Sequence, residues 1–494
     1  MPHSPQARLP HHRPPHHRRR LRRTALAAAV PLLLLTAAAP PPAPLGIGDR
    51  LFPHLGNPGY HVTDYALAFD YRGNDKPLDA VTTIEARSTE RLTRFNLDFA
   101  RGTVRSIEVN GAHAEFTPVE EDLVVTPARP VPRHTPFTVT VHHTSDPRGG
   151  REGGWVTTKD GLVMANQADA AHRVFPGSDH PSEKADFRFR IRAPKELTVV
   201  ANGVATGRTT QGATTTWTYR TRHPMATELV QVAIGRSAVL EATGPHGLPL
   251  RSVVPAGARD GLAPWVAKTP EQLTWLERRL GRYPFENYGV LMAEATTGFE
   301  LETQTLSLFE RDLFTKRTVP SWYLESVMVH ELAHQWFGDS VTPRTWGDLW
   351  LNEAHATWYE AEYAEHKGGR KLADRMRRAY EYSDLMRADG GAPAALKQPA
   401  PGRKVAIFRP VVYDGGAVVL YALRQKIGAR AFEELERAWV DRYADGTVST
   451  ADFVALASKA AHRDLSGFLL PWLYDTTTPP MPGHPDWKAT RKPA

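Results

Sequence analysis

The hydrophobic period of the sequence changes near residue 250, and this change limits the chain to a small set of folds. In residues 60–234, apolar and polar residues alternate in short segments separated by turn formers such as Asn110-Gly111. Such alternation is typical of strands with one buried face. The predicted strands are Tyr65–Tyr71, Val104–Val109, Leu123–Thr126, Phe137–Val141, Phe187–Ile191 and Thr214–Tyr219. We therefore expect an all-β domain, a saddle or a sandwich, over residues 45–243.

Beyond residue 250 the apolar residues recur at helical spacing. The predicted helices are Thr269–Leu280, Ser321–Phe337, Leu349–His366, Gly416–Ile427, Ala431–Tyr443 and one from about Ala451. The segment 244–248 is interpreted as the join between the two parts. We expect a mostly helical domain over residues 244–480, then a C-terminal tail, residues 481–494, with loose chain already from Thr476. The fold class is thus α+β with more than one domain.

Residues 1–44 have the composition of a secretory signal with a proline-rich leader. Residues 1–23 contain seven arginines, five histidines and no acidic residue, and the apolar stretch Ala25–Ala39 ends in small residues. We expect a secreted or extracytoplasmic protein, free or associated with the cell envelope. An uncleaved anchor is the alternative. No other apolar run reaches the roughly 18 residues of a membrane helix, so we expect no stable span after cleavage.

Composition excludes several classes of function. The net charge of +7 equals the seven arginines of the leader, so the remainder is close to neutral and we expect no nucleic-acid partner. The chain has no cysteine, which excludes disulfides, thiolate metal sites and a cysteine nucleophile. Any metal must therefore be held by nitrogen and oxygen ligands.

A candidate metal site lies in the second predicted helix, at His330–His334 (HELAH). Residues four apart share one helix face, so both imidazoles can reach one ion while Glu331 addresses a water beside it. A third histidine at position 340 would complete one common type of site, but Ser340 stands there. Glu353 follows His334 by 19 residues, on the next predicted helix. We expect one Zn²⁺ held by these two histidines and Glu353, with a fourth position open for water.

This ligand set indicates hydrolytic chemistry. Zinc held by two imidazoles and a carboxylate lowers the pKa of its water toward about 7 and polarises a carbonyl. Glu331 is then placed to act as the general base and to return the proton to the leaving amine. The alternative is a buried cluster of histidine and glutamate without a metal.

Three stretches of the sequence resemble the aminopeptidase N family of zinc metallopeptidases, the gluzincins. They are His330–Ser340 (HELAHQWFGDS), Trp346–Thr357 (WGDLWLNEAHAT) and Phe175–Phe187 (FPGSDHPSEKADF), and the likeness extends from about Phe52 to Pro482. The resemblance implies an N-terminal β domain followed by a thermolysin-like catalytic domain. It also implies hydrolysis of N-terminal residues from peptides.

The same resemblance assigns further roles. Glu302, in the segment Leu301–Thr305, matches the glutamate that binds the free α-amine of the substrate in this family. Tyr413 matches the family's tyrosine donor to the oxyanion, and Gln167 and Asp169 match positions that line the first substrate pocket.

Two departures from the family pattern stand out. Ala354 and His355 follow Glu353 where the family has glycine and an aromatic residue, and helical spacing points His355 away from the metal. The resemblance also implies a short form, without the large C-terminal helical domain of many relatives, and hence a more open cavity.

Two other functions remain open from the sequence. An endopeptidase would use the same zinc chemistry, with Glu302 not placed to hold an amine. A catalytically idle zinc-binding protein that captures peptides is a different class, which the presence of Glu331 and Tyr413 disfavours. The expected partners are peptides with a free N-terminus, and nothing in the sequence indicates an oligomeric state.

Overall fold

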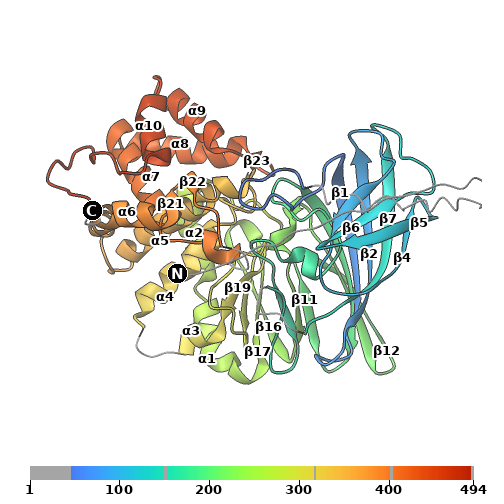
Figure 1. The fold of residues 1–494 in the computed structure, drawn as a ribbon. Coiled ribbons are helices and arrows are strands. Elements are labelled where there is room, and N and C mark those ends of the chain that lie inside the picture. The colour runs from blue at the N-terminus through green and yellow to red at the C-terminus, as the bar shows by residue number, and fades with distance from the viewer. Residues whose placement is uncertain (1–45, 149–152, 316–318, 401–403, 491–494) are drawn as a thin grey trace, which may run out of the picture. The chain divides into compact units, whose positions relative to one another are not determined.

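The computed structural model of the chain describes residues 46–148, 153–315, 319–400 and 404–490 (Figure 1). The predicted signal and leader, residues 1–44, lie outside these ranges. Within them, no helix is both long enough and apolar enough to cross a lipid bilayer.

The first part of the described chain forms two β-sheets, blue to green in Figure 1. The eleven-stranded sheet has the order β12-β13-β10-β1-β2-β7-β4-β5-β6-β3, with β14 paired to β10. Its strands are β1 (Tyr60–Asp70), β2 (Leu78–Ser88), β3 (Phe95–Asp98), β4 (Val104–Val109), β5 (Ala112–Val119), β6 (Asp122–Thr126), β7 (Pro136–Ser145), β10 (Lys184–Pro194), β12 (Val204–Gln211), β13 (Thr214–Arg220) and β14 (Met225–Ala226). The four-stranded sheet contains β8 (Gly154–Thr157), β9 (Leu162–Ala165), β11 (Thr198–Ala201) and β15 (Val232–Gly235).

Alternation along the strands explains the core of this part. In β10, Phe187, Phe189 and Ile191 point inward while Arg188 and Arg190 face out. The inward residues share one apolar cluster with β9 and β11 of the second sheet. The predicted all-β architecture is thus confirmed.

Strand β2 was not among the predicted strands, and its buried face explains why. That face includes two polar residues, Thr82 and Ser88, which hide the usual alternation. Thr82 Oγ1 lies 2.9 Å from His143 Nε2 of β7, so its burial leaves no unsatisfied hydroxyl.

A third sheet begins the second part of the chain. Its order is β16-β17-β18-β19, with bounds Ser237–Thr243, Pro249–Pro255, Val290–Ala293 and Ser307–Glu310. The segment 244–248, interpreted from the sequence as a join between domains, is the turn of the β16–β17 hairpin. Sheet pairing therefore favours a boundary just before Ser237. Val163 and Val200 of the preceding sheet pack with Leu291 and Leu308 here, which ties the two parts together.

The helices follow, in yellow to red in Figure 1. Their bounds are α1 (Arg259–Val266), α2 (Thr269–Leu280), α3 (Arg311–Thr315), α4 (Ser321–Ala333), α5 (Trp350–His366), α6 (Leu372–Gly390), α7 (Asp414–Ile427), α8 (Ala429–Arg442), α9 (Thr450–Ala460) and α10 (Ser466–Tyr474). The predicted helices are all present, and α2 has the predicted bounds. Helix α6 was not predicted, because its apolar stripe is narrow in a strongly charged segment.

The expectation of a loose tail from Thr476 is wrong. Met481 and Trp487 are buried in the main helical core, and the Trp487 ring stacks on Tyr421 at 5.7 Å between centroids. Thr490 N donates to Glu381 O of α6. A polar composition rich in proline and threonine concealed these two apolar anchors.

A glycine sets the distance between α5 and α7. A Cβ atom added to Gly416 of α7 would lie 2.6 Å from the Cβ of Ala354 on α5, well inside van der Waals contact. The two helices can approach this closely only with glycine at that position. Because Ala354 directly follows Glu353, this contact also positions the predicted metal ligand.

We predict that Gly416→Ala lowers the free energy of unfolding by about 1–3 kcal/mol, because the added methyl group overpacks this interface. Urea titration followed by circular dichroism measures the change. The matched control is Gly467→Ala in α10, where an added Cβ meets nothing within 4 Å. It should leave stability within about 1 kcal/mol of wild type. Equal stability of all three proteins would contradict the packing argument.

Candidate metal centre

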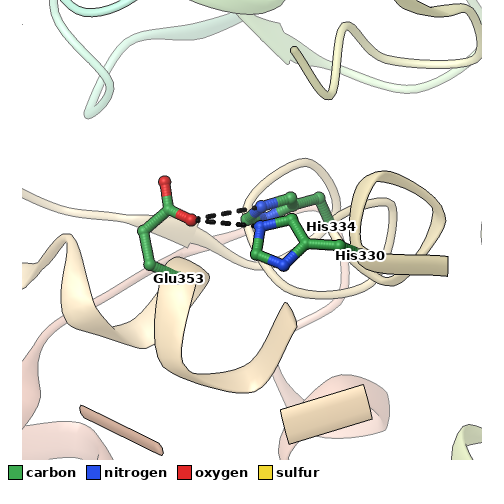
Figure 2. Close-up of side chains that lie close together, drawn as sticks. All are labelled: His330, His334 and Glu353. Carbon is green, nitrogen blue, oxygen red and sulfur yellow. Dashed lines mark ion pairs between the residues drawn. The ribbon is translucent and has the colours of Figure 1, made fainter. Parts of the chain in front are cut away.

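Helices α4 and α5 bring the three predicted ligands together (Figure 2). Glu353 Oε2 lies 3.5 Å from His330 Nε2 and 3.4 Å from His334 Nε2. His330 and His334 lie at the C-terminal end of α4, and Glu353 lies in the first turn of α5. All three side chains are buried. One atom from each residue thus converges on a single point, as a tetrahedral site with one open position requires.

The remaining imidazole nitrogens orient the two rings. His330 Nδ1 lies 3.2 Å from Oε2 of Glu360, which follows Glu353 on α5 by seven residues, or about two helical turns. His334 Nδ1 lies 3.0 Å from the carbonyl oxygen of Phe337. With Nδ1 of each ring serving as the hydrogen-bond donor, both Nε2 atoms present lone pairs to the centre. The buried Glu353 Oε2 has no hydrogen-bond partner among the described residues. These groups therefore fit a divalent cation such as zinc.

The electrostatics of the centre favour positive charge. Burial opposes ionisation of Glu353, but His334 and His330 outweigh it and lower the pKa of this carboxyl to about 2. Burial likewise opposes the charged form of His330, yet the nearby carboxylates of Glu353 and Glu360 raise its pKa to about 9. In the absence of metal, protons on the histidines supply the cationic charge that the carboxylates attract.

Glu331 projects into the same buried space. Burial raises the pKa of its carboxyl to about 8, against the lowering effect of His330 and His334. In the metal-free protein this carboxyl therefore keeps its proton near neutral pH, whereas a divalent cation at the three ligands would favour the ionised form that a general base requires. Glu331 forms a second close group with Glu302 and His334, whose ligand atoms lie within 4.8 Å of one another.

Tyr413 stands at the start of α7, beside the metal ligands. Its ring stacks on His330 with 6.1 Å between centroids. Burial, followed by the nearby charges of Glu353 and Glu302, raises the pKa of the phenol well above its usual value. Tyr413 therefore keeps its proton and is able to donate a hydrogen bond across the centre.

The β-sheet part contributes to this site through Gln167. Its side-chain amide donates a 2.7 Å hydrogen bond to Glu302 Oε1, and both residues line one cavity of about 470 Å³ with the metal ligands. A second hydrogen bond fixes the main chain of Glu302, because Gln335 Nε2 donates to the backbone carbonyl oxygen of Glu302 at 3.0 Å. Glu302 is therefore fixed on both sides.

Asp169, which the resemblance places at the first substrate pocket, and Glu300, a sequence neighbour of Glu302, interact with other residues. Asp169 is buried but is not among the residues that line the cavity, and its charge acts on His172 instead. Glu300, a neighbour of Glu302 in the sequence, lines the cavity but accepts a hydrogen bond from Glu310 N. Burial raises the pKa of Glu300 to about 8.

Sequence reasoning missed a cluster at the far side of this cavity. Arg375 of α6 donates to Glu360 Oε1 at 2.8 Å and to Asp414 Oδ1 at 3.1 Å. Glu360 in turn orients His330. The seven-residue spacing from Glu353 to Glu360 on one helix was a usable signal, whereas the contributions of α6 and α7 required the tertiary structure.

Comparison with known proteins finds matches in one peptidase family for both parts of the chain. The Peptidase M1 N-terminal domain matches residues 65–229, and the Peptidase family M1 domain matches residues 266–472. Aminopeptidase N of Streptomyces lividans is 25% identical over 83% of this chain and 50% of its own length. Probable aminopeptidase 1 of Saccharolobus solfataricus is 23% identical over 86% of this chain and 54% of its own. The chain thus spans about half the length of these relatives.

Solved structures of similar length exist. The M1 zinc metallopeptidase of Deinococcus radiodurans has a TM-score of 0.75 and 26% identity, covering 90% of this chain and 99% of its own. A mutant of that enzyme, described as bound to a Tyr-Ser-Ala substrate, has a TM-score of 0.77 and covers 88% of this chain. With both domains matched in order, the chain belongs to peptidase family M1, the family of aminopeptidase N.

Proposed function

We propose that this protein is a zinc aminopeptidase that removes N-terminal residues from peptides. The observation that carries the proposal is the position of Glu302. Its carboxylate lies in one cavity with the ligand set and within 4.8 Å of ligand atoms of Glu331 and His334. The α-nitrogen and the carbonyl carbon of one residue are about 2.5 Å apart. An ammonium group bound at Glu302 therefore brings only the first peptide bond to the centre.

The charges and hydrogen bonds support this assignment. A carboxylate buried beside a neutral amide is a suitable acceptor for a substrate ammonium group, and Gln167 holds it in place. The structure neighbour from Deinococcus radiodurans is described as bound to a Tyr-Ser-Ala substrate, which is consistent with a peptide substrate here.

The catalytic roles follow from the same geometry. Zinc bound by His330, His334 and Glu353 supplies a Lewis acid that polarises the scissile carbonyl and activates a water. Glu331 accepts the proton of the attacking water and later delivers it to the leaving amine. Tyr413 donates a hydrogen bond to the developing oxyanion, a type of contact worth about 10²–10³ in rate.

The proposal predicts which substrates the wild type cleaves and how two variants change that activity. We expect the purified protein to release aminoacyl-arylamides and to leave N-acetylated forms intact. Glu302→Ala should lose activity on free-amine substrates because the ammonium loses its partner. Glu331→Gln should lose about 10²–10⁴-fold in kcat while retaining its zinc, because it removes only the base. Kinetics together with the metal content of each variant check both expectations.

Other outcomes would identify another function. Cleavage of blocked peptides at internal bonds, with Glu302→Ala unaffected, would indicate an endopeptidase. Stoichiometric zinc with no turnover of any peptide would indicate a peptide-capture protein.

We predict that zinc affinity rises with pH between pH 6 and pH 9, because the nearby carboxylates raise the pKa of both His330 and His334. In the metal-free protein, the pKa of His330 is raised to about 9, so a proton must leave this ring before zinc binds. Each displaced proton weakens apparent affinity about tenfold per pH unit below that value. Chelator competition between pH 6 and pH 9 measures the slope, and an affinity independent of pH would contradict the charge assignment.

We also propose that the chain is exported, because the basic segment 1–23 precedes the apolar stretch Ala25–Ala39. Expression in a bacterial host should yield an extracytoplasmic protein whose N-terminus lies near residue 40. Mass spectrometry of that protein checks this. A full-length chain confined to the cytoplasm would refute the proposal.

A further inference from the structure

A second cavity, of about 360 Å³, opens beside the metal centre. It shares four lining residues with the metal cavity, namely Tyr323, Glu360, Arg375 and Asp414. Neither Gln167 nor Glu302 borders it. Glu360, which contacts His330, borders both cavities, whereas Glu302 borders only the metal cavity. The second cavity therefore adjoins the metal cavity on a side that Glu302 does not line, where the part of a peptide beyond the scissile bond can lie.

The second cavity has an excess of positive charge. Arg375 is matched by Glu360 and Asp414, at 2.8 Å and 3.1 Å. Arg370 and Arg378 also line the cavity, and neither has an ion pair or hydrogen bond within the part of the chain that the structure describes. Two guanidinium groups are thus left without a partner of opposite charge.

Helix α6 presents this charge on one face. Arg375, Arg378, Tyr382 and Met386 follow helical spacing, and all of them line the cavity. Arg377 lies on another face, where its Nε is 3.2 Å from Glu381 Oε1, and it does not line the cavity. The chain thus provides a matched control: two adjacent, exposed arginines on one helix, only one of them at the cavity.

We propose that this second cavity is a subsite that binds a carboxylate of the substrate downstream of the scissile bond, through Arg370 and Arg378. The inference rests on the proposed aminopeptidase function and narrows its substrate class to short peptides with a carboxylate a few residues from the N-terminus. An extended residue spans about 3.3–3.6 Å, so the distance from the metal limits the peptide lengths that place a carboxylate here. Guanidinium groups form charge-assisted hydrogen bonds with carboxylates, and both sources of carboxylate, the C-terminus and an acidic side chain, offer the same group.

The test compares matched peptides on the zinc-loaded protein. Alanine peptides of two to six residues are assayed as free acids and as C-terminal amides. A second set of amides carries glutamate or glutamine at each position after the first. For the wild type, we expect the free acid of the best length to exceed its amide in kcat/KM by about three- to tenfold. The difference should lie in KM, because the contact is equal in ground and transition states.

The variants locate the contact. Arg378→Gln and Arg370→Gln should each reduce the acid-to-amide ratio toward one, and the double variant should abolish it. Arg377→Gln should keep the wild-type ratio. Added salt should lower the ratio for the wild type but not for the double variant, since exposed charges are screened. The glutamate series shows whether a side chain or the C-terminus supplies the carboxylate.

Three results would overturn the proposal. The first is an acid-to-amide ratio of kcat/KM equal to one in the wild type at every peptide length. The others are an equal loss of kcat/KM for acid and amide in Arg378→Gln, or the same change of the ratio in Arg377→Gln as in Arg378→Gln. Failure of the aminopeptidase assignment itself is distinguishable. Aminoacyl-arylamides carry no downstream carboxylate. If the aminopeptidase assignment is wrong, the wild-type protein will release no arylamine from these substrates.

Discussion

The convergence of α4 and α5 on one point is the constraint on which the rest of the structure depends. Two imidazoles from α4 and one carboxylate from α5 meet with separations of 3.4 and 3.5 Å. Such an approach of buried groups is stable only when the charges balance, and either a metal ion or protons on the two histidines supply the positive charge that balances Glu353. The close contact of Gly416 with Ala354 sets the position of α5, and the hydrogen bond from His330 Nδ1 to Glu360 orients one of the two imidazoles.

Carboxylates surround the centre more densely than cations do. Burial raises the pKa of Glu331 and of Glu300, whereas Glu353 and Glu360 stay ionised because histidine or arginine contacts them. The same residue type thus takes different protonation states according to its partners. This division separates carboxylates that hold their charge beside histidine or arginine from those whose protonated form burial favours.

The β-sheet part is more than a cover for the catalytic part. Gln167 reaches Glu302 in the cavity, and the Lys184 ammonium donates to the carbonyl oxygens of Asp339 and Ser340, just after the metal-binding helix. Asp49 accepts a hydrogen bond from Trp346 N in the loop before α5. Buried hydrogen bonds of this kind fix the orientation of the groups that they join as well as add stability. The reason is that a buried polar group left without a partner raises the free energy of the folded state. The surroundings of Glu302 in the cavity therefore depend on both parts of the chain.

The sequence by itself determined the fold class and predicted that the side chains of His330, His334, Glu353 and Glu331 meet, because helical spacing and motif spacing are local properties that do not depend on distant packing. It also placed Tyr413 and Glu302 through the family resemblance. It did not reveal strand β2, helix α6 or the packed end of the chain around Trp487, where buried polar residues or sparse apolar anchors obscure the pattern. Only the tertiary structure brought Arg375 and Glu360 behind His330 and separated Asp169 from the cavity. Such placements depend on how distant elements pack, and a linear pattern does not encode that directly.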